Sequence, residues 1–345
     1  MTGFALYRLP YATEATMVRQ IEGEPAELLS CQELNGRRGF VVAPFEVTPE
    51  QPILLIRPDI VQTVDLQAGA FQYELPLVAS SRPAGGNRTT YAIDFANFHS
   101  QLNLGAFQKI VLARCADEQT MATPAELFLR ACERYPRIMI ALVWTEKSGC
   151  WLMATPEILL EGKDDAWRTI ALAGTMRLEG EGLEGEGESV TWSIKNIQEQ
   201  RIVTTYITEC LEQYTSDFCE EGPHTVRAAN LVHLRSDFTF TLPDRSHIGD
   251  LLHTLHPTPA VCGLPKRETF QFIVRHEHTP RRYYSGFLGM LDPDRETHLY
   301  VSLRCMNIET DGCHLYAGGG LLKDSTEEQE WNETEAKLET MRRIL

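Results

Sequence analysis

The chain has 345 residues, of which 43% are hydrophobic and 23% charged, and its formal net charge at pH 7 is -16. This composition is typical of a folded globular protein and excludes a largely disordered chain. The negative charge argues against nucleic acid and anionic membrane surfaces as partners. The longest apolar run, residues 138–144, is far shorter than the roughly 20 residues of a membrane-spanning helix.

Two further features bear on the cellular compartment. The first residues, MTGFALYRLPY, lack the basic stretch and the sustained apolar stretch of a secretory signal. The nine cysteines are scattered, odd in number and without a CxxC pair, which argues against a disulfide framework or a zinc ribbon. We therefore expect reduced thiols in a cytoplasmic protein, with a monomer as the default oligomeric state.

The first half of the chain contains a strand-rich block that is followed by a long helix. Residues 80–90 (SSRPAGGNRTT) are predicted to form a long surface loop. An acidic, glycine-rich loop is predicted over 179–188, and an amphipathic helix over about 189–214. The strands predicted between these loops cover residues 109–115, 137–144, 151–160 and 167–177.

The second half repeats this order. Turns at Asp292-Pro293-Asp294 and Asp311-Gly312 separate strands predicted over 282–291, 297–308 and 314–321. Asp324 or Ser325 can cap a final helix that runs to about residue 343. The recurrence suggests an internal duplication, although the two blocks share no obvious sequence identity. Strands followed by helices predict an α+β fold with mostly antiparallel sheets.

Acidic residues recur on one face of the final predicted helix. Glu330, Glu333 and Lys337 are spaced i, i+3 and i+7 and therefore project from the same side. Spacing alone leaves two interpretations open: a solvated Glu–Lys stripe, or carboxylates that bind a hard cation such as Mg²⁺. Glu199 offers a similar carboxylate in the earlier helix. The paired histidines of the chain do not match a zinc-binding spacing.

Nine short segments carry more information than any single residue. In chain order they are FQKIVLAR (107–114), ATPEILLEG (154–162), LAGT (172–175), LVHLRS (231–236), LHPTPAVCGLPK (255–266), YYSGFLG (283–289), LYVSLRC (299–305), YAGGGL (316–321) and EWNETEAKL (330–338). This string resembles the chorismate-binding enzyme family, and within it the isochorismate synthases. The resemblance covers about residue 100 to the C-terminus, whereas the first 95 or so residues carry no recognisable motif.

The resemblance implies a fold and an activity. The fold is a single chorismate-binding domain over residues 1–345, an α+β structure of two stacked antiparallel sheets flanked by helices. The implied activity is Mg²⁺-dependent conversion of chorismate to isochorismate, for menaquinone or siderophore biosynthesis. In this reaction water adds at one ring carbon while the allylic hydroxyl leaves from another, so a base and an acid must act on opposite sides.

Two residues are implied as the acid and the base. Lys109 is the expected general base, and its pKa should be lowered by burial or by neighbouring cations. Glu157 is the expected general acid, and its apolar neighbours should raise its pKa. From the residues alone, Lys109 could instead be an edge residue that reaches solvent, and Glu157 a surface carboxylate at a strand end.

The implied metal ligands are Glu199 and Glu333, one from each long helix, with Glu330 beside them. Mg²⁺ commonly uses one or two protein carboxylates together with water and substrate oxygens. This chain departs from a pattern common in the family, because Asn196 and Gln200 stand where many members have Glu and His.

The remaining implied residues contact the substrate. Arg304, Tyr284 and Lys337 would bind its carboxylates, because guanidinium, hydroxyl and ammonium groups all donate hydrogen bonds. The other residues expected to line or position the ring are Gly174, Thr175, His233, Ala260, Gly318, Gly319 and Gly320.

Relatives with other activities remain alternatives. Salicylate synthases share Lys109 and Glu157, but they tend to have Thr at the position of Ala260. Aminodeoxychorismate synthases carry a lysine nucleophile where this chain has Ala173, and anthranilate synthases generally lack the counterpart of Lys109. An alternative from another class is a catalytically silent chorismate-binding subunit.

Overall fold

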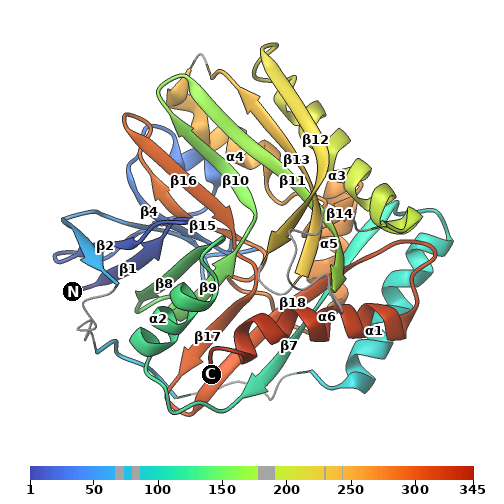
Figure 1. Cartoon of the computed structure of the whole chain (residues 1–345), viewed down its shortest axis with the longest axis horizontal. Helices are drawn as coiled ribbons and strands as arrows, with labels where there is room; N and C mark the ends of the chain where they lie inside the picture. The colour runs from blue at the N-terminus through green and yellow to red at the C-terminus, as the bar shows by residue number, and fades with distance from the viewer. Residues whose placement is uncertain (67–73, 80–85, 178–190, 229–230, 243) are drawn as a thin grey trace.

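The computed structural model describes the whole chain except residues 67–73, 80–85, 178–190, 229–230 and 243 (Figure 1). The strands of this described part form two antiparallel sheets of nine strands each. The order in the first sheet is β14 (Gly263–Leu264), β7 (Lys109–Glu118), β18 (Gly312–Leu321), β17 (Cys305–Glu309), β9 (Gly149–Thr155), β8 (Met139–Thr145), β1 (Gly3–Arg8), β2 (Glu14–Gln20) and β6 (Ile60–Asp65). The order in the second sheet is β12 (Phe218–Ala228), β13 (Leu231–Phe240), β11 (Ala166–Arg177), β10 (Ile158–Lys163), β16 (Glu296–Val301), β15 (Phe287–Leu291), β4 (Gly39–Ala43), β5 (Ile53–Ile56) and β3 (Ala26–Leu28).

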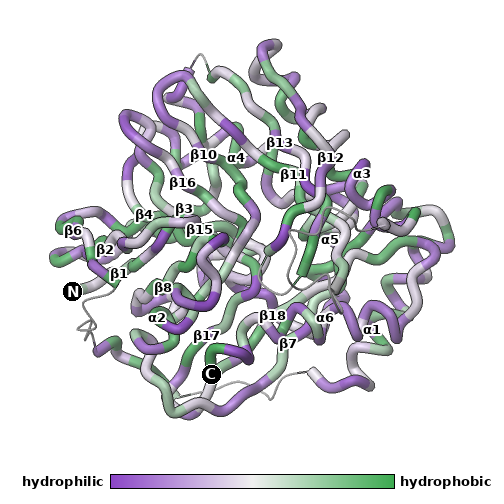
Figure 2. Tube along the Cα trace, in the orientation of Figure 1, coloured by the Kyte–Doolittle hydropathy of each residue, from purple (hydrophilic) through white to green (hydrophobic). Residues whose placement is uncertain are grey.

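The sheets stack face to face, and the side chains between them form one core cluster. On β8, Ala141 and Val143 point into this cluster, whereas Leu142 and Trp144 point to the opposite face. Successive side chains of a strand alternate between the two faces, and here both faces are covered. This explains why the longest apolar run of the sequence forms a strand. Figure 2 shows the hydrophobic residues following the strands through the middle of the molecule.

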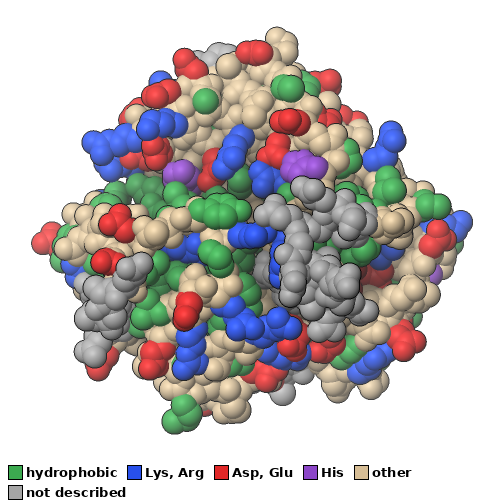
Figure 3. All heavy atoms as spheres, in the orientation of Figure 1, with side chains coloured by type: hydrophobic (Ala, Val, Ile, Leu, Met, Phe, Trp, Pro, Cys, Tyr) green, Lys and Arg blue, Asp and Glu red, His purple; other side chains and the backbone are tan. Residues whose placement is uncertain are grey.

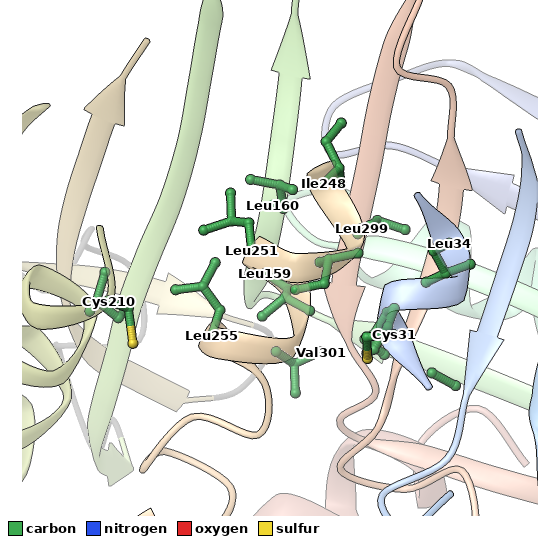
Figure 4. Packing of buried hydrophobic residues seen from close by; sticks show 14 of the residues in the cluster. Cys31, Leu34, Leu159, Leu160, Cys210, Ile248, Leu251, Leu255, Leu299 and Val301 are labelled. Atoms are coloured by element: carbon green, nitrogen blue, oxygen red, sulfur yellow. The ribbon is translucent and has the colours of Figure 1, made fainter. Parts of the chain in front are cut away.

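Helices cover the outer faces of both sheets. Helices α3 and α4 pack on the second sheet, α2 and α6 on the first sheet, and α1 and α5 beside β7 and β14. Figure 4 shows Leu251 and Leu255 of α4 beside the strand residues Leu159, Leu299 and Val301. The bounds are α1 (Arg88–Asn103), α2 (Pro124–Arg134), α3 (Ile194–Leu211), α4 (Ile248–Leu255), α5 (Lys266–His276) and α6 (Glu327–Arg342), with short 3₁₀ turns η1 (Cys31–Leu34) and η3 (Arg245–His247).

The topology repeats in the way that the sequence pattern suggested. Strands β8 and β9 of the first sheet lead into β10 and β11 of the second sheet, and α3 follows. Strands β15 and β16 of the second sheet lead into β17 and β18 of the first sheet, and α6 follows. The N-terminal strands extend both sheets, because β1 pairs with β8 and β4 pairs with β15. Thus each half of the repeat crosses once between the sheets.

The two crossings correct the strand predictions. Residues 151–160 are not one strand, because β9 ends at Thr155 and β10 begins in the other sheet after Pro156, which has no N–H for a sheet ladder. Residues 297–308 are likewise divided between β16 and β17. The break includes Arg304, whose φ of 42° is incompatible with a strand. The strand predicted over 282–291 begins only at Phe287, because Arg282 and Ser285 also have positive φ angles of 51° and 62°.

Helix starts also differ from the prediction. Residues 88–90, expected in a loop, form the first turn of α1, because the Asn87 side chain accepts a hydrogen bond from Thr90 N at 3.0 Å. Residues 80–85 and the acidic loop at 179–188 lie outside the described residues. Helix α3 starts after Ser193, and α6 starts after Thr326 rather than after Asp324 or Ser325. No helix in the described ranges combines the length and the apolar character needed to cross a bilayer.

Candidate active site

The two crossings between the sheets lie side by side and carry two of the predicted site residues. Glu157 follows Pro156 between β9 and β10, and Arg304 ends the link between β16 and β17. Val301 N donates a hydrogen bond to Glu157 O at 2.9 Å, and Ala154 N donates one to Arg304 O at 3.0 Å. These backbone bonds hold an acidic and a basic residue together although they are far apart in sequence.

A cavity of about 60 Å³ lies beside these crossings. Eleven predicted residues line it: Glu157, Gly174, Thr175, Glu199, His233, Ala260, Tyr284, Arg304, Gly318, Gly320 and Lys337. The other predicted residues, Lys109, Gly319, Glu330 and Glu333, are not among the lining residues. The sequence analysis did not predict a lining role for Val111, Leu172, Ala173, Val261, Leu303, Tyr316 and Ala317. Most of these neighbour predicted residues, and only sheet pairing shows which of them face the cavity.

Glu157 is buried in a position that favours its neutral form. Only 2% of the surface of Glu157 is exposed to solvent. Burial raises the pKa of Glu157 from the usual 4.5 to about 8, although the charges of Lys109, Arg304 and Lys337 work to lower it. The raised pKa expected for Glu157 is therefore found. Its carboxyl group holds a proton at neutral pH and can donate it.

Arg304 is positioned by His233. An arginine can only donate hydrogen bonds, so the bond from Arg304 Nη2 to His233 Nε2 leaves the histidine proton on Nδ1. That proton is donated to Gly174 O at 3.0 Å. Burial, followed by the charges of Arg304 and Lys337, lowers the pKa of His233 well below its usual range, so the ring is neutral. His233 thus acts on Arg304, and both of its ring nitrogens are engaged by protein groups.

One donor of Arg304 remains available. Its Nη1 is buried and has no hydrogen-bond partner among the described residues. Burial lowers the pKa of Arg304 to about 10, which still leaves it charged at neutral pH. A buried cationic donor without a partner is unfavourable unless an anion takes its place in the cavity. The arrangement is suited to an anionic ligand.

Three carboxylates beside the cavity are each held by a lysine. Lys109 Nζ lies 2.8 Å from Glu199 Oε1, and Lys337 Nζ lies 2.8 Å from Glu333 Oε1. The third pair joins Lys195 of α3 to Glu330 of α6. The first pair connects β7 with α3 and the third connects α3 with α6, so these two form part of the packing between elements, whereas the pair of Lys337 and Glu333 lies within α6.

The burial of these carboxylates affects their pKa values differently. Burial works to raise the pKa of Glu199, but the charges of Lys109 and Lys195 lower it overall. Burial and the nearby charge of Glu333 raise the pKa of Glu330 above its ordinary value. The lysine charges thus outweigh burial at Glu199, whereas at Glu330 burial and the charge of Glu333 outweigh the opposing charge of Lys195.

The glycines of β18 are required by these side chains. A Cβ atom added at Gly320 would lie 2.2 Å from Glu199 Oε1 and 2.8 Å from Lys109 Cε. At Gly318 it would lie 2.7 Å from the Tyr284 hydroxyl oxygen. Real Cβ atoms do not approach that closely, so only glycine allows the glutamate, lysine and tyrosine to pack against this strand.

Comparison with known proteins identifies the family. A family model described as "Chorismate binding enzyme" matches residues 61–345. The chain belongs to the chorismate-binding enzyme family. The chain is 32% identical over 245 residues to "Isochorismate synthase MenF" of Escherichia coli (strain K12). This match covers 70% of this chain and 56% of that protein. It is 32% identical over 262 residues to "Salicylate biosynthesis isochorismate synthase" of Pseudomonas aeruginosa. This match covers 71% of this chain and 52% of that protein. The chain therefore spans little more than half the length of these two relatives.

Solved structures show the same fold. A solved structure described as a "putative 2,3-dihydroxybenzoate-specific isochorismate synthase, DhbC" from Bacillus anthracis has a TM-score of 0.82 at 22% identity, and the match covers 99% of this chain and 96% of that one. Anthranilate synthase component I from Streptococcus pneumoniae has a TM-score of 0.69 at 14% identity, covering 99% of this chain and 92% of that one. The predicted α+β fold of two antiparallel sheets with flanking helices is thus confirmed as that of the chorismate-binding enzyme family.

The family resemblance implies carboxylates as metal ligands, and carboxylate oxygens are the type of ligand that a hard cation such as Mg²⁺ prefers. Glu330 Oε2 is buried without a hydrogen-bond partner among the described residues, and Gly319 leaves room for it, since a Cβ there would lie 2.9 Å away. Their oxygens do not converge here, however. Within the described part of the chain, three His, Cys, Asp or Glu ligand atoms lie within 4.8 Å of one another only at Cys115, Asp117 and His314.

The two positions that depart from the family pattern have structural partners. Gln200 accepts a hydrogen bond from Ala173 N at 2.9 Å and donates one to Ala171 O at 3.1 Å, which fixes α3 to β11. Asn196 packs against Gly174, where an added Cβ would lie 3.1 Å from Asn196 Cβ. Both side chains therefore support the strand that carries Gly174.

Proposed function

We propose that this chain is a Mg²⁺-dependent isochorismate synthase, which isomerises chorismate to isochorismate for menaquinone or siderophore biosynthesis. One observation carries the proposal: a single cavity is lined both by a buried acid whose pKa is raised, Glu157, and by a buried guanidinium with a spare donor, Arg304. The names of the relatives support it, because both sequence relatives described above are called isochorismate synthases.

The proposed chemistry divides between an acid and a base. Glu157 would give its proton to the allylic hydroxyl, which then leaves as water instead of hydroxide. Lys109 would take a proton from the water that attacks the ring. A base must be neutral, and Lys109 is in an ion pair with Glu199, so this contact has to be released before Nζ can accept a proton.

The proposed cofactor is Mg²⁺. Glu199 and Glu333 would hold it, with Glu330 beside them, and the donor set of carboxylate oxygens suits this ion. When bound, the metal would neutralise charge on the ring carboxylate. The contacts between these glutamates and their lysines would have to open for the carboxylates to hold the metal.

Substrate recognition would rest on cations inside an acidic protein. Arg304 and Lys337 line the cavity together with Tyr284 and Gly318, so cationic and neutral donors are concentrated where two carboxylates would bind. On the face shown in Figure 3, Lys, Arg and His side chains gather across the middle. A local excess of positive charge can attract a dianion although the net charge of the chain is -16.

The test is incubation with chorismate and Mg²⁺, followed by chromatographic identification of the product. We expect isochorismate from the natural sequence and none from the Glu157→Gln variant, whose side chain is of equal size but cannot donate an acidic proton. Binding of chorismate without any turnover would favour the alternative of a catalytically silent binding subunit.

Salicylate synthase is the second candidate, and position 260 bears on it. Ala260 lines the cavity, so its side chain can affect the pose of the substrate. A threonine there would add a hydroxyl group and a branch at Cβ. With alanine we expect release of isochorismate. Rapid pyruvate formation from chorismate, measured with lactate dehydrogenase, would instead assign salicylate synthase activity.

The proposal treats residues 1–345 as one catalytic domain that acts as a monomer in the cytoplasm, without nucleic acid or membrane partners. The N-terminal part of the chain contributes β1 to the first sheet and β4 to the second, which supports a single domain. Light scattering of the purified chain tests the oligomeric state.

A further inference from the structure

The proposed metal site pairs each of its carboxyl groups with a lysine before any metal is added. Its three glutamates, Glu199, Glu330 and Glu333, are paired one to one with three lysines. Lys109 and Lys337 already have roles in the proposed reaction. Lys195, the partner of Glu330, has none.

Glu330 shows how this lysine is used. The carboxylate is fully buried, and Oε1 receives both Lys195 Nζ and the Ser325 hydroxyl, the latter at 2.6 Å. Oε2 has no hydrogen-bond partner among the described residues and lies against Gly319. One oxygen is therefore engaged and the other is available. A buried carboxylate without a cation would be strongly unfavourable, so Lys195 stabilises the protein when no metal is present.

The position of Lys195 allows it to leave. It lies one helical turn before Glu199 on α3, so both side chains project from the same face toward α6. Its side chain is 25% exposed, whereas that of Lys109 is 0% exposed. The Lys195 ammonium can thus swing into solvent on its flexible stem, while Lys109 has no such route.

We propose that Lys195 is a built-in counterion of the metal site, which holds Glu330 in the metal-free protein and lowers the affinity of the site for Mg²⁺. The inference rests on the proposed function, because it takes Glu199, Glu330 and Glu333 as the metal-binding group. A dication that enters beside three balanced ion pairs meets an ammonium at each carboxylate. Repulsion between like charges a few ångström apart in a buried site is strong, so the metal binds only as tightly as displacement of Lys195 permits.

The test is calorimetric titration of Mg²⁺ alone into the full-length natural chain and into Lys195→Met. Removing the ammonium should tighten Mg²⁺ binding by roughly tenfold or more. Lys195→Arg keeps the charge and is the matched control, so its affinity should stay within a few-fold of the natural chain. In the double variant Lys195→Met/Glu330→Gln both charges are gone, and the gain in affinity should disappear.

Thermal melting gives a second measurement. Without metal, Lys195→Met should have a lower melting temperature than the natural chain, because Glu330 has lost its cation. Added Mg²⁺ should raise the melting temperature of the variant more than it raises that of the natural chain. The double variant guards against misfolding, because it leaves no unpaired charge. Equal or weaker Mg²⁺ binding by Lys195→Met, with the control variants folded, would overturn the inference. Failure of the proposed function would instead appear as absence of isochorismate from the natural chain.

Discussion

Replacing Glu157 with glutamine should change both turnover and the pH dependence of stability. In the folded protein the Glu157 carboxyl group has a pKa of about 8, against an ordinary value of 4.5. Between these two values the unfolded chain loses the proton while the folded chain keeps it. Wild-type stability therefore falls as the pH rises through this interval and levels off above about pH 8. The glutamine side chain does not titrate, so the Glu157→Gln variant lacks this loss.

The size of the effect follows from the pKa difference. A tenfold difference in proton affinity corresponds to about 1.4 kcal/mol, so the difference at Glu157 corresponds to an upper limit of roughly 5 kcal/mol. We expect the free energy of unfolding of Glu157→Gln, minus that of wild type, to grow steadily from pH 5 to pH 8. Isochorismate formation should be lost in the variant at every pH. In wild type, turnover should fall above about pH 8, where Glu157 gives up its proton.

Glu161→Gln is the matched control, because Glu161 lies four residues further on and is also buried. Burial works to raise its pKa, but hydrogen bonds from His298 and Tyr300 and the charge of Arg168 hold it at about 2. Glu161 is thus ionised in both states above pH 5, and its stabilising effect is lost only as the pH falls toward 2. The control should lower stability by an amount that does not change between pH 5 and pH 8.

The assay is urea unfolding of the three proteins at four values from pH 5 to pH 8, with product chromatography at each pH. A stability difference for Glu157→Gln that is as flat as that of the control would mean that Glu157 is already ionised in the folded protein at pH 5. It could then not serve as the general acid near neutral pH, and the reasoning from burial would be wrong.

Further substitutions test the other roles. Lys109→Ala should lower turnover by about 10²–10⁴-fold while calorimetry still detects chorismate binding; near wild-type turnover would contradict the base assignment. Glu199→Ala and Glu333→Ala should each raise the Mg²⁺ concentration that half-maximal activity requires, and full activity in excess EDTA would remove the metal from the mechanism. Gly320→Ala should abolish most activity, because its Cβ would lie 2.2 Å from Glu199 Oε1; an active variant would show that this packing is dispensable. Ala260→Thr should increase pyruvate release in a coupled lactate dehydrogenase assay, and an unchanged rate would leave Ala260 as a packing residue.

The local sequence predicts most of the secondary structure near the site. Strand β11 and helices α3 and α6 agree with the predicted segments to within a few residues, because alternation of apolar residues and helix capping depend on neighbours in the chain. The same local signals failed at residues 151–160 and 297–308. Each segment is apolar on both sides of its break, and the change of sheet depends on pairing with strands far away in the sequence.

The site shows the same division. Its motif residues were named from a family resemblance, and eleven of them line one cavity. Lys195 belongs to the helix pattern that the family shares, but the resemblance assigned it no role. Its contact with Glu330 joins two helices that are far apart in the chain, and no local pattern predicts such a pair.

The sequence by itself determined the folded character of the chain, its strands and helices and, through nine ordered motifs, its family. The tertiary structure decided what those residues experience. Glu157 has apolar neighbours in the sequence, but its pKa of about 8 arises because the crossings between two sheets remove it from water. Glu199 and Glu330 are both helix carboxylates, yet their pKa values move in opposite directions. Desolvation and charge–charge interaction depend on distances in space, and those distances exist only once the two sheets and their helices have packed together.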